Sequence, residues 1–325
     1  MTRFYLSVLT IFSVLTTSAQ QMSTDIFLTS FGMNREGQYF FTAPLNITHR
    51  PGYDNQPSFS RDGSKVYYVA YYDTLQSDIF VYNLEDSTNT RLTETPESEF
   101  SPRVTTDDLG FTVVRVDADK GQRLYRILMD GTNEFQLLGV SDSVAYYCIA
   151  NDSTYAVADL NNNVMELNIY EMPGEQFIPL AKNIGRCIAV IPDGDNEISY
   201  VDKADTNGYM LMSFSINSGL IGSVCQLKKG VEDYVWTKDG KLLIGYEGKL
   251  MMFDRSKPEN GWTELADFSK SVGNFYRIAI SQQGTQLALV AYTKEDKKQD
   301  ATKDDSGKKD EKAANLAGLK AKQKP

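Results

Sequence analysis

Apolar and polar positions alternate along this chain in short segments, with hardly any of the three-to-four-residue period that marks a helix. Residues 65–72 are apolar on both alternating faces, which predicts a strand that is covered on both sides. Polar turns at 73–77 and 85–89 separate this segment from the next candidate strands. The pattern therefore predicts an all-β chain whose strands follow one another through tight turns.

One polar turn recurs between these strands at a nearly constant spacing. Its clearest form is Arg61-Asp62-Gly63, and weaker copies end at positions 108, 153, 194, 240 and 284, in steps of 45, 45, 41, 46 and 44 residues. Asp-Gly suits a tight turn because glycine adopts a positive φ at no steric cost. A period in the forties, with a strand on either side of each turn, predicts one four-stranded blade of a β-propeller per step.

The last repeat contains only its first two strands, at 276–281 and 286–292. Two unassigned strand candidates, 25–33 and 44–48, lie at the other end of the repeats. Together these four segments make one blade. We therefore expect an all-β, six-bladed β-propeller closed by N-terminal strands that complete the last blade, which leaves no open strand edge between blades.

The two ends of the chain differ in composition from the repeats. Arg3, an apolar run over 4–15 and Thr17-Ser18-Ala19 predict a signal peptide over 1–19, with a buried N-terminal helix or strand as the alternative. Residues 20–294 would then form the propeller. The charged segment 295–325 is expected to be a disordered tail, or to form a short helix over 311–322 that docks on a partner. The mature chain is therefore expected to be exported.

The charge of the chain restricts its partners. The net charge is −10 and is more negative still, −13, over the expected propeller alone. An acidic body argues against nucleic acid as a partner, because phosphates require a stripe of Lys and Arg. The apolar run at the N-terminus is too short for a membrane span, so we expect no transmembrane segment in the mature chain. The three cysteines, at 148, 187 and 225, are expected to be buried small hydrophobes.

The first repeat resembles the TolB-type propeller repeat. It contains Asp54-Asn55-Gln56-Pro57-Ser58-Phe59-Ser60-Arg61-Asp62-Gly63, followed by Asp78-Ile79-Phe80-Val81 and Thr90-Arg91-Leu92-Thr93. The later repeats match mainly in spacing, and Arg61 replaces the usual proline. The resemblance implies a six-bladed propeller that serves as a scaffold for protein contacts in an exported protein of the periplasm or cell surface of a Gram-negative bacterium. Because the repeats begin almost at the expected cleavage site, we expect the separate N-terminal domain of TolB to be absent.

Residue sets that would carry chemistry are sparse. His49 is the only histidine, no nucleophile-elbow motif occurs, and we expect no cofactor and no metal. Asp117 and Asp119 lie in a fragment of a calcium loop, which leaves a weak calcium site open as an alternative. Carboxylates are abundant, so a carboxylate-based hydrolase is the less favoured alternative to a non-enzymatic protein.

The loops that enter the innermost strands line one end of a propeller's central channel, and the repeat alignment identifies them. We expect partner binding there, by a protein or an envelope component, and a basic or amphipathic peptide fits this mixture of acids and aromatic rings. A glycan or small-molecule receptor that uses the same mouth is the main alternative. The residues are Asp54, Asn55, Glu99, Phe100, Asp142, Arg186, Glu232, Asp233, Phe275 and Tyr276.

Overall fold

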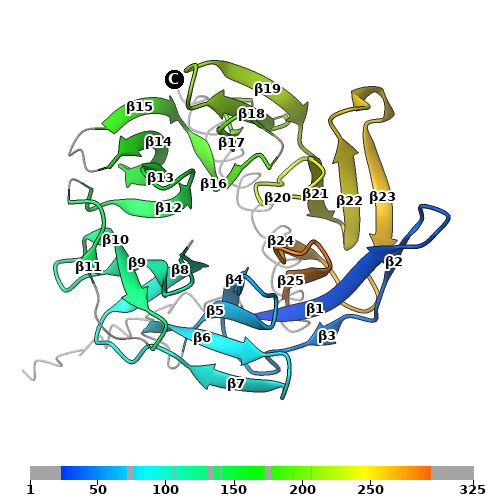
Figure 1. The fold of residues 1–325 in the computed structure, drawn as a ribbon, viewed down its shortest axis with the longest axis horizontal. Helices are drawn as coiled ribbons and strands as arrows, with labels where there is room; N and C mark the ends of the chain where they lie inside the picture. The colour runs from blue at the N-terminus through cyan, green and yellow to red at the C-terminus, as the bar shows by residue number, and fades with distance from the viewer. Residues whose placement is uncertain are drawn as a thin grey trace, which may run out of the picture.

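A computed structural model describes residues 23–71, 76–105, 107–130, 135–139, 141–172, 177–192, 194–205 and 207–293. The expected signal peptide and the expected tail lie outside the described residues. Six sheets surround a central axis, and the innermost strand of each faces that axis (Figure 1). The expected six-bladed, all-β propeller is confirmed.

Blades 1 to 5 each contain four antiparallel strands in chain order from the axis outward. Blade 1 comprises β4 (Asp54–Phe59), β5 (Lys65–Tyr71), β6 (Ser77–Asn83) and β7 (Thr88–Arg91). Blade 2 comprises β8 (Ser98–Val104), β9 (Gly110–Val116), β10 (Gln122–Leu128) and β11 (Phe135–Gln136). Blade 3 comprises β12 (Val144–Ile149), β13 (Thr154–Asn161), β14 (Val164–Glu171) and β15 (Phe177–Lys182).

Blades 4 and 5 repeat this order. Blade 4 comprises β16 (Ile184–Val190), β17 (Glu197–Asp202), β18 (Met210–Ser215) and β19 (Ile221–Gln226). Blade 5 comprises β20 (Val235–Trp236), β21 (Lys241–Tyr246), β22 (Lys249–Asp254) and β23 (Trp262–Asp267), with the short 3-10 helix η1 (Pro258–Asn260) before its last strand.

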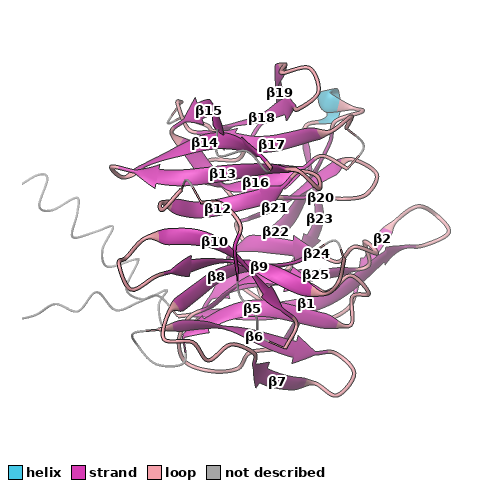
Figure 2. Cartoon of the chain, turned by 60° about the vertical axis from the view of Figure 1, so that its left-hand side comes forward, coloured by secondary structure: helices cyan, strands magenta, loops and turns pink. Residues whose placement is uncertain are grey.

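Blade 6 joins the two ends of the propeller. Its inner strands are β24 (Phe275–Ile280) and β25 (Gln286–Tyr292), and β1 (Thr24–Met33) pairs antiparallel with β25 from Thr24–Tyr292 to Ser30–Gln286. Two short strands, β2 (Tyr39–Phe41) and β3 (Leu45–Asn46), pair with different halves of β1. The expected closure is confirmed. The sequence did not reveal β2, which forms a hairpin with β1 that extends beyond the ring (Figure 2).

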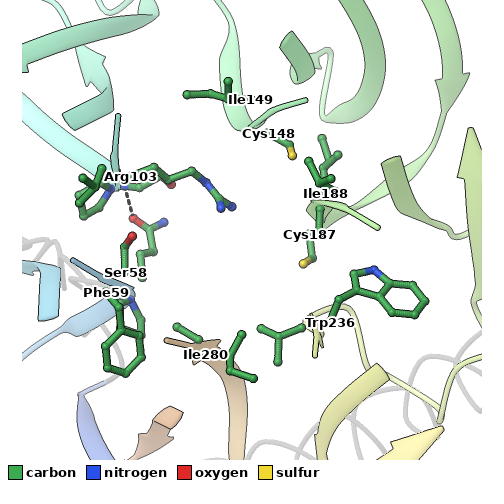
Figure 3. A pocket seen from close by; sticks show the side chains of 18 of the residues that line it. Ser58, Phe59, Arg103, Cys148, Ile149, Cys187, Ile188, Trp236 and Ile280 are labelled. Carbon is green, nitrogen blue, oxygen red and sulfur yellow. Dashed lines mark hydrogen bonds between the residues drawn. The ribbon is translucent and has the colours of Figure 1, made fainter. Parts of the chain in front are cut away.

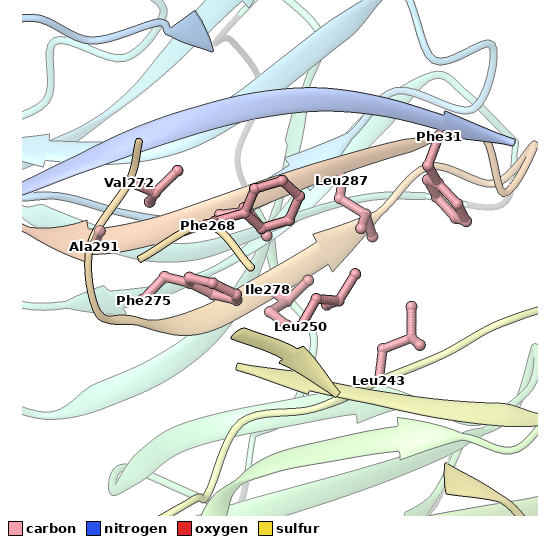
Figure 4. Packing of buried hydrophobic residues seen from close by; sticks show 10 residues of the cluster. Phe31, Leu243, Leu250, Phe268, Val272, Phe275, Ile278, Leu287 and Ala291 are labelled. Carbon is pink, nitrogen blue, oxygen red and sulfur yellow. The ribbon is translucent and has the colours of Figure 1, made fainter. Parts of the chain in front are cut away.

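Apolar side chains fill the wedges between neighbouring blades. Phe59 and Trp236, each three or four residues before an Asp-Gly turn, are two of these side chains, and both are buried. At the seam between blades 5 and 6, Phe31 and Leu287 pack in one cluster with Leu243 of blade 5 (Figure 4). The N-terminal strand therefore supplies core to the ring as well as backbone hydrogen bonds.

The innermost strands share a local irregularity near their starts. The register shifts in five of them, β4, β8, β12, β16 and β24, before regular pairing resumes. Two non-glycine residues at these bulges, Gln56 and Ser101, have φ values of 53° and 54°. Bulges of this kind change the direction in which the following side chains point, so they decide which residues face the channel.

Candidate functional site: the central channel

The central channel contains a cavity of about 570 Å³, which is within the usual size range of ligand pockets. All six innermost strands contribute to its wall. At one end it is bounded by Arg186, Asp233 and Arg277, and at the other it reaches the turns that carry Arg61 and Asp108. We call these the strand-start end and the strand-finish end, after the direction of the innermost strands.

An ionic cluster of Arg186, Asp233 and Arg277 occupies the strand-start end. The Asp233 carboxylate is buried and accepts hydrogen bonds from Nε of Arg186 at 2.7 Å and from Nε of Arg277 at 2.9 Å. Burial opposes ionisation of Asp233, but Arg277 and Arg186 hold its pKa below the usual value. The cluster joins blades 4, 5 and 6 across the channel.

Two expected site residues extend this cluster toward blade 1. Oδ1 of Asn55 accepts a hydrogen bond from Arg277 at 2.8 Å, and its Nδ2 donates to the hydroxyl of Tyr276 at 2.5 Å. Asn55 is itself buried. The structure therefore brings Asn55, Arg186, Asp233 and Tyr276 together around Arg277, a residue that the repeat alignment did not select.

Five of the ten expected partner-contacting side chains are buried, namely Asn55 and Asp233, described above, and Asp54, Glu99 and Phe275, which corrects that part of the prediction. Asp54 and Glu99 are both 0% exposed and Phe275 is 2% exposed. Phe275 lies in the core between blades 5 and 6. The loops that lead into the innermost strands fold over the first residues of those strands, so these side chains face protein and cannot contact a partner directly.

The two buried acids occupy equivalent positions in blades 1 and 2. Asp54 accepts a hydrogen bond from Nη2 of Arg50 at 2.5 Å, and Glu99 accepts one from the Thr93 hydroxyl at 3.0 Å. Burial raises the pKa of both carboxyl groups to about 7, and the ion pair with Arg50 only partly offsets it for Asp54. Neither side chain lines the cavity.

The remaining expected residues differ in exposure. Asp142 is exposed. Glu232 is half buried and accepts a hydrogen bond from Nζ of Lys203 at 3.0 Å. Phe100 is half buried, because part of its ring packs against the apolar clusters on both sides of blade 2.

Half-buried aromatic rings of blades 1, 2 and 6 lie at the strand-start end. The rings of Tyr53 and Tyr71 are 5.5 Å apart, those of Tyr71 and Phe100 are 6.5 Å apart, and Tyr276 stacks on Tyr292 at 4.8 Å. We call these five residues the aromatic rim. Repeat alignment found only Phe100 and Tyr276, because the other three lie just outside the loops that it selected.

Asp117 and Asp119, the fragment of a calcium loop, are held by arginines. Asp117 pairs with Arg115 at 2.7 Å and with Arg123 at 2.8 Å, and Asp119 pairs with Arg123 at 2.8 Å. Cations of the protein thus already neutralise these oxygens. Across the described residues, no group of three or more His, Cys, Asp or Glu side chains is arranged to hold a metal ion. The described part of the chain also contains no helix with the length and apolar character that a membrane crossing requires.

The fold and its closure define the chain as a six-bladed β-propeller, and solved structures with the same fold include TolB proteins. A putative TolB from Agrobacterium tumefaciens superposes with a TM-score of 0.61 and 12% identity, over 84% of this chain and 99% of that one. TolB from Acinetobacter baumannii gives a TM-score of 0.53 and 11% identity over 83% of this chain. This chain spans 64% of that TolB's length. The propeller is therefore TolB-like in fold.

The same fold also carries enzymes. A gluconolactonase from Xanthomonas campestris superposes with a TM-score of 0.57 and 11% identity, over 77% of this chain and 90% of that one. No protein-family model matches the sequence, and a search of curated proteins gave no match. Because one fold supports unrelated functions, the function has to be argued from the channel itself.

Proposed function

We propose that this chain is an exported, non-enzymatic β-propeller scaffold that binds another protein, or a component of the cell envelope, at the strand-start end of its channel. The observation that carries the proposal is the aromatic rim at the end that the ionic cluster fills. Aromatic residues and arginine are enriched at protein interfaces, where large rings exclude water at a low cost in conformational entropy. A filled, ring-lined end suits a macromolecular surface better than a small ligand.

The carboxylates argue against a hydrolase. An acid–base pair needs two carboxyl groups near the substrate, with the pKa of one raised. Asp54 and Glu99 have raised pKa values but lie outside the cavity wall. Asp233 and Asp108 line the cavity, but both are paired with arginines. This arrangement supports a role in binding.

The position of the acids also narrows the class of partner. Of the five acids expected to attract a basic peptide, three are buried (Asp54, Glu99 and Asp233), Glu232 is half buried and Asp142 is exposed. The half-buried rings of the aromatic rim are accessible beside the last two acids, and Arg186 lies 5.4 Å from the ring centre of Tyr276. We therefore favour an amphipathic protein segment whose apolar side chains pack on the rim.

A charge placed on the rim tests this proposal. Tyr71→Glu puts a carboxylate among the rings without breaking any hydrogen bond of the Tyr71 hydroxyl described in the structure, and Tyr71→Phe keeps the ring as the matched control. The wild-type chain and each variant serve as bait in extracts of the native cell envelope. We expect Tyr71→Glu to recover about tenfold less of the specific partner than the wild type does. We expect Tyr71→Phe to retain it.

A second control lies at the strand-finish end, where Arg61→Ala removes an exposed ion pair with Asp108 at 3.5 Å. This variant should capture the partner as the wild type does. Equal capture by Tyr71→Glu and the wild type, with unchanged melting temperatures, would refute the proposed surface.

A further inference from the structure

We propose that the cavity binds a small organic anion, with its carboxylate held by Arg103 and its apolar part against the opposite wall of the channel. Arg103 belongs to β8, and Figure 3 shows its guanidinium group directed into the open centre of the channel. The site opens toward the strand-finish end, so it is distinct from the aromatic rim and does not rest on the protein-binding function proposed above.

Arg103 differs from the other arginines of the cavity in having no anionic partner among the described residues. Arg186 and Arg277 share Asp233, and Arg61 pairs with Asp108. The contact recorded for the Arg103 guanidinium is with the ring of Tyr147, at 5.7 Å from its centre. Arg103 is exposed to the water of the channel, and a cation that lines a channel without a counter-charge attracts anions that enter it.

The backbone before Arg103 is fixed, so the side chain starts from a defined position. Ser101, at the bulge of β8, adopts a positive φ of 54°. Its N–H donates to Oε1 of Gln56 at 2.7 Å, and its carbonyl accepts from the Tyr147 hydroxyl at 2.8 Å. Blades 1 and 3 thus both hold this bulge. A non-glycine residue kept at positive φ by its surroundings is a feature that concentrates at binding sites.

Gln56 supplies a second donor near Arg103. Its Oε1 is used by Ser101, which leaves the Nε2 amide group, on a residue that lines the cavity, without an acceptor among the described residues. The residues one repeat before and after Arg103 are Ser58 and Cys148, both of which also line the cavity. These side chains are small, so they leave room for the guanidinium group and for a ligand beside it.

The wall across the channel from Arg103 is apolar. Cys187 and Ile188 lie there, and Cys148 and Ile280 lie on the parts of the wall to either side (Figure 3). Burial raises the pKa of the Cys187 thiol to about 12 and also raises that of Cys148, so both are neutral and do not compete for Arg103. A carboxylate attached to an apolar body matches a cation that faces such a wall, and planar carboxylate oxygens match the fork of a guanidinium group.

Ligand-induced melting shifts of the purified chain test this inference. The probes are benzoate, 3-phenylpropionate and octanoate, each paired with its neutral amide, together with inorganic phosphate. We expect a saturable rise in melting temperature with the carboxylates and none with the amides, since a ligand that binds only the folded state stabilises it. Arg103→Met should weaken carboxylate binding by about ten- to a hundredfold, as expected for loss of a hydrogen bond between charged groups.

Arg61→Met is the matched control, because it removes a cavity cation that already has a carboxylate partner. It should leave the affinity within about twofold of the wild type. The inference is overturned if no probe gives a saturable shift, if the amides bind as well as the acids, or if Arg103→Met binds like the wild type. Response to phosphate alone would also overturn it, because the apolar wall would then have no role. None of these outcomes changes the expected partner capture at the aromatic rim.

Discussion

The two ends of the channel use the same side chain, arginine, in opposite ways. At the strand-start end, Arg186 and Arg277 are both paired with the buried Asp233, and the cavity stops at this cluster. Farther along, Arg103 faces open space with no carboxylate of the described residues beside it. The comparison teaches that pairing, rather than charge alone, separates a structural arginine from one that is available to a ligand.

The paired arginines connect blades that are distant in sequence. Arg277 lies in β24 and reaches both Asp233, just before β20, and Asn55 in β4. Removing the shared carboxylate leaves two partly buried arginines without their counter-charge, which costs much more than loss of an exposed pair. The comparison therefore predicts unequal effects of substitutions at the two ends.

The largest effect is expected from Asp233→Ala. It leaves two arginines without their shared carboxylate, and we expect a loss of about 3–5 kcal/mol in the free energy of unfolding. Denaturant unfolding measures this change. Asp142→Ala, at an exposed position of the same end, is the control and should stay within about 0.5 kcal/mol of the wild type. Similar unfolding midpoints for the two variants would show that the ionic cluster contributes little to the stability of the fold.

The next largest effect is on the pH dependence of the free energy of unfolding, to which different carboxylates contribute with opposite signs. Burial raises the folded-state pKa of Glu99 from 4.5 to about 7, so its contribution to stability is fully present below about pH 4.5 and is lost as the pH rises through 7. The shift corresponds to up to about 3 kcal/mol at 1.36 kcal/mol per pKa unit. Asp233, whose pKa is lowered, contributes stability above its ordinary pKa of 3.8 that is lost on acidification.

Glu99→Gln isolates the first of these contributions. We expect the variant to lose less stability than the wild type between about pH 5 and pH 8, measured by urea unfolding at each pH. Asp54, whose pKa is also raised to about 7, is unchanged in this variant and should still cause the remaining loss of stability over this pH range. A pH profile of Glu99→Gln that is parallel to the wild-type profile would show that the Glu99 carboxyl group does not titrate in this range.

A smaller effect is expected where a neutral group supports the cluster. Tyr276→Phe removes the hydroxyl that accepts from Asn55 at 2.5 Å, and a loss of about 1 kcal/mol in unfolding free energy should follow. Tyr209→Phe is the matched control, because the recorded contact of Tyr209 is between its ring and Lys203 at 5.6 Å. The prediction fails if both substitutions change the melting temperature equally.

The smallest effect on stability is expected from Arg103→Met in the absence of ligand. No ion pair with a described carboxylate is lost, so the free energy of unfolding should stay within about 0.5 kcal/mol of the wild type. Thermal melting of the ligand-free protein measures it. A loss comparable to that of Asp233→Ala would make Arg103 a structural residue and erase the contrast between the two ends.

The ring could be predicted from the sequence because its signals are local. Each blade carries its own turn, such as Asp62-Gly63, and its own alternation of apolar residues. Even the closure followed, since the two strands missing from blade 6 were present at the N-terminus, and the register places Thr29 opposite Leu287 and Asp25 opposite Ala291.

The site was less predictable because its geometry is not local. Repeat spacing placed Asp54 and Glu99 in the loops that enter the inner strands, whereas both lie at the starts of those strands, and it does not report that the preceding loops cover them. The pairing of Arg277 with Asp233 joins different blades, so no spacing rule links them. The one available signal was an arginine inside an apolar inner strand, which marks both Arg277 and Arg103.

The pairing of β1 with β25 has a consequence for how the protein folds. Thr24 pairs with Tyr292, so almost the whole described chain must be synthesised before this sheet can form. Contacts between such distant residues form slowly, because chain entropy is lost before they are made. Until then, the edge of β1 that pairs with β25 stays vacant and can pair with another chain. A growing chain therefore remains vulnerable to aggregation until β25 has been synthesised, however stable the finished ring is.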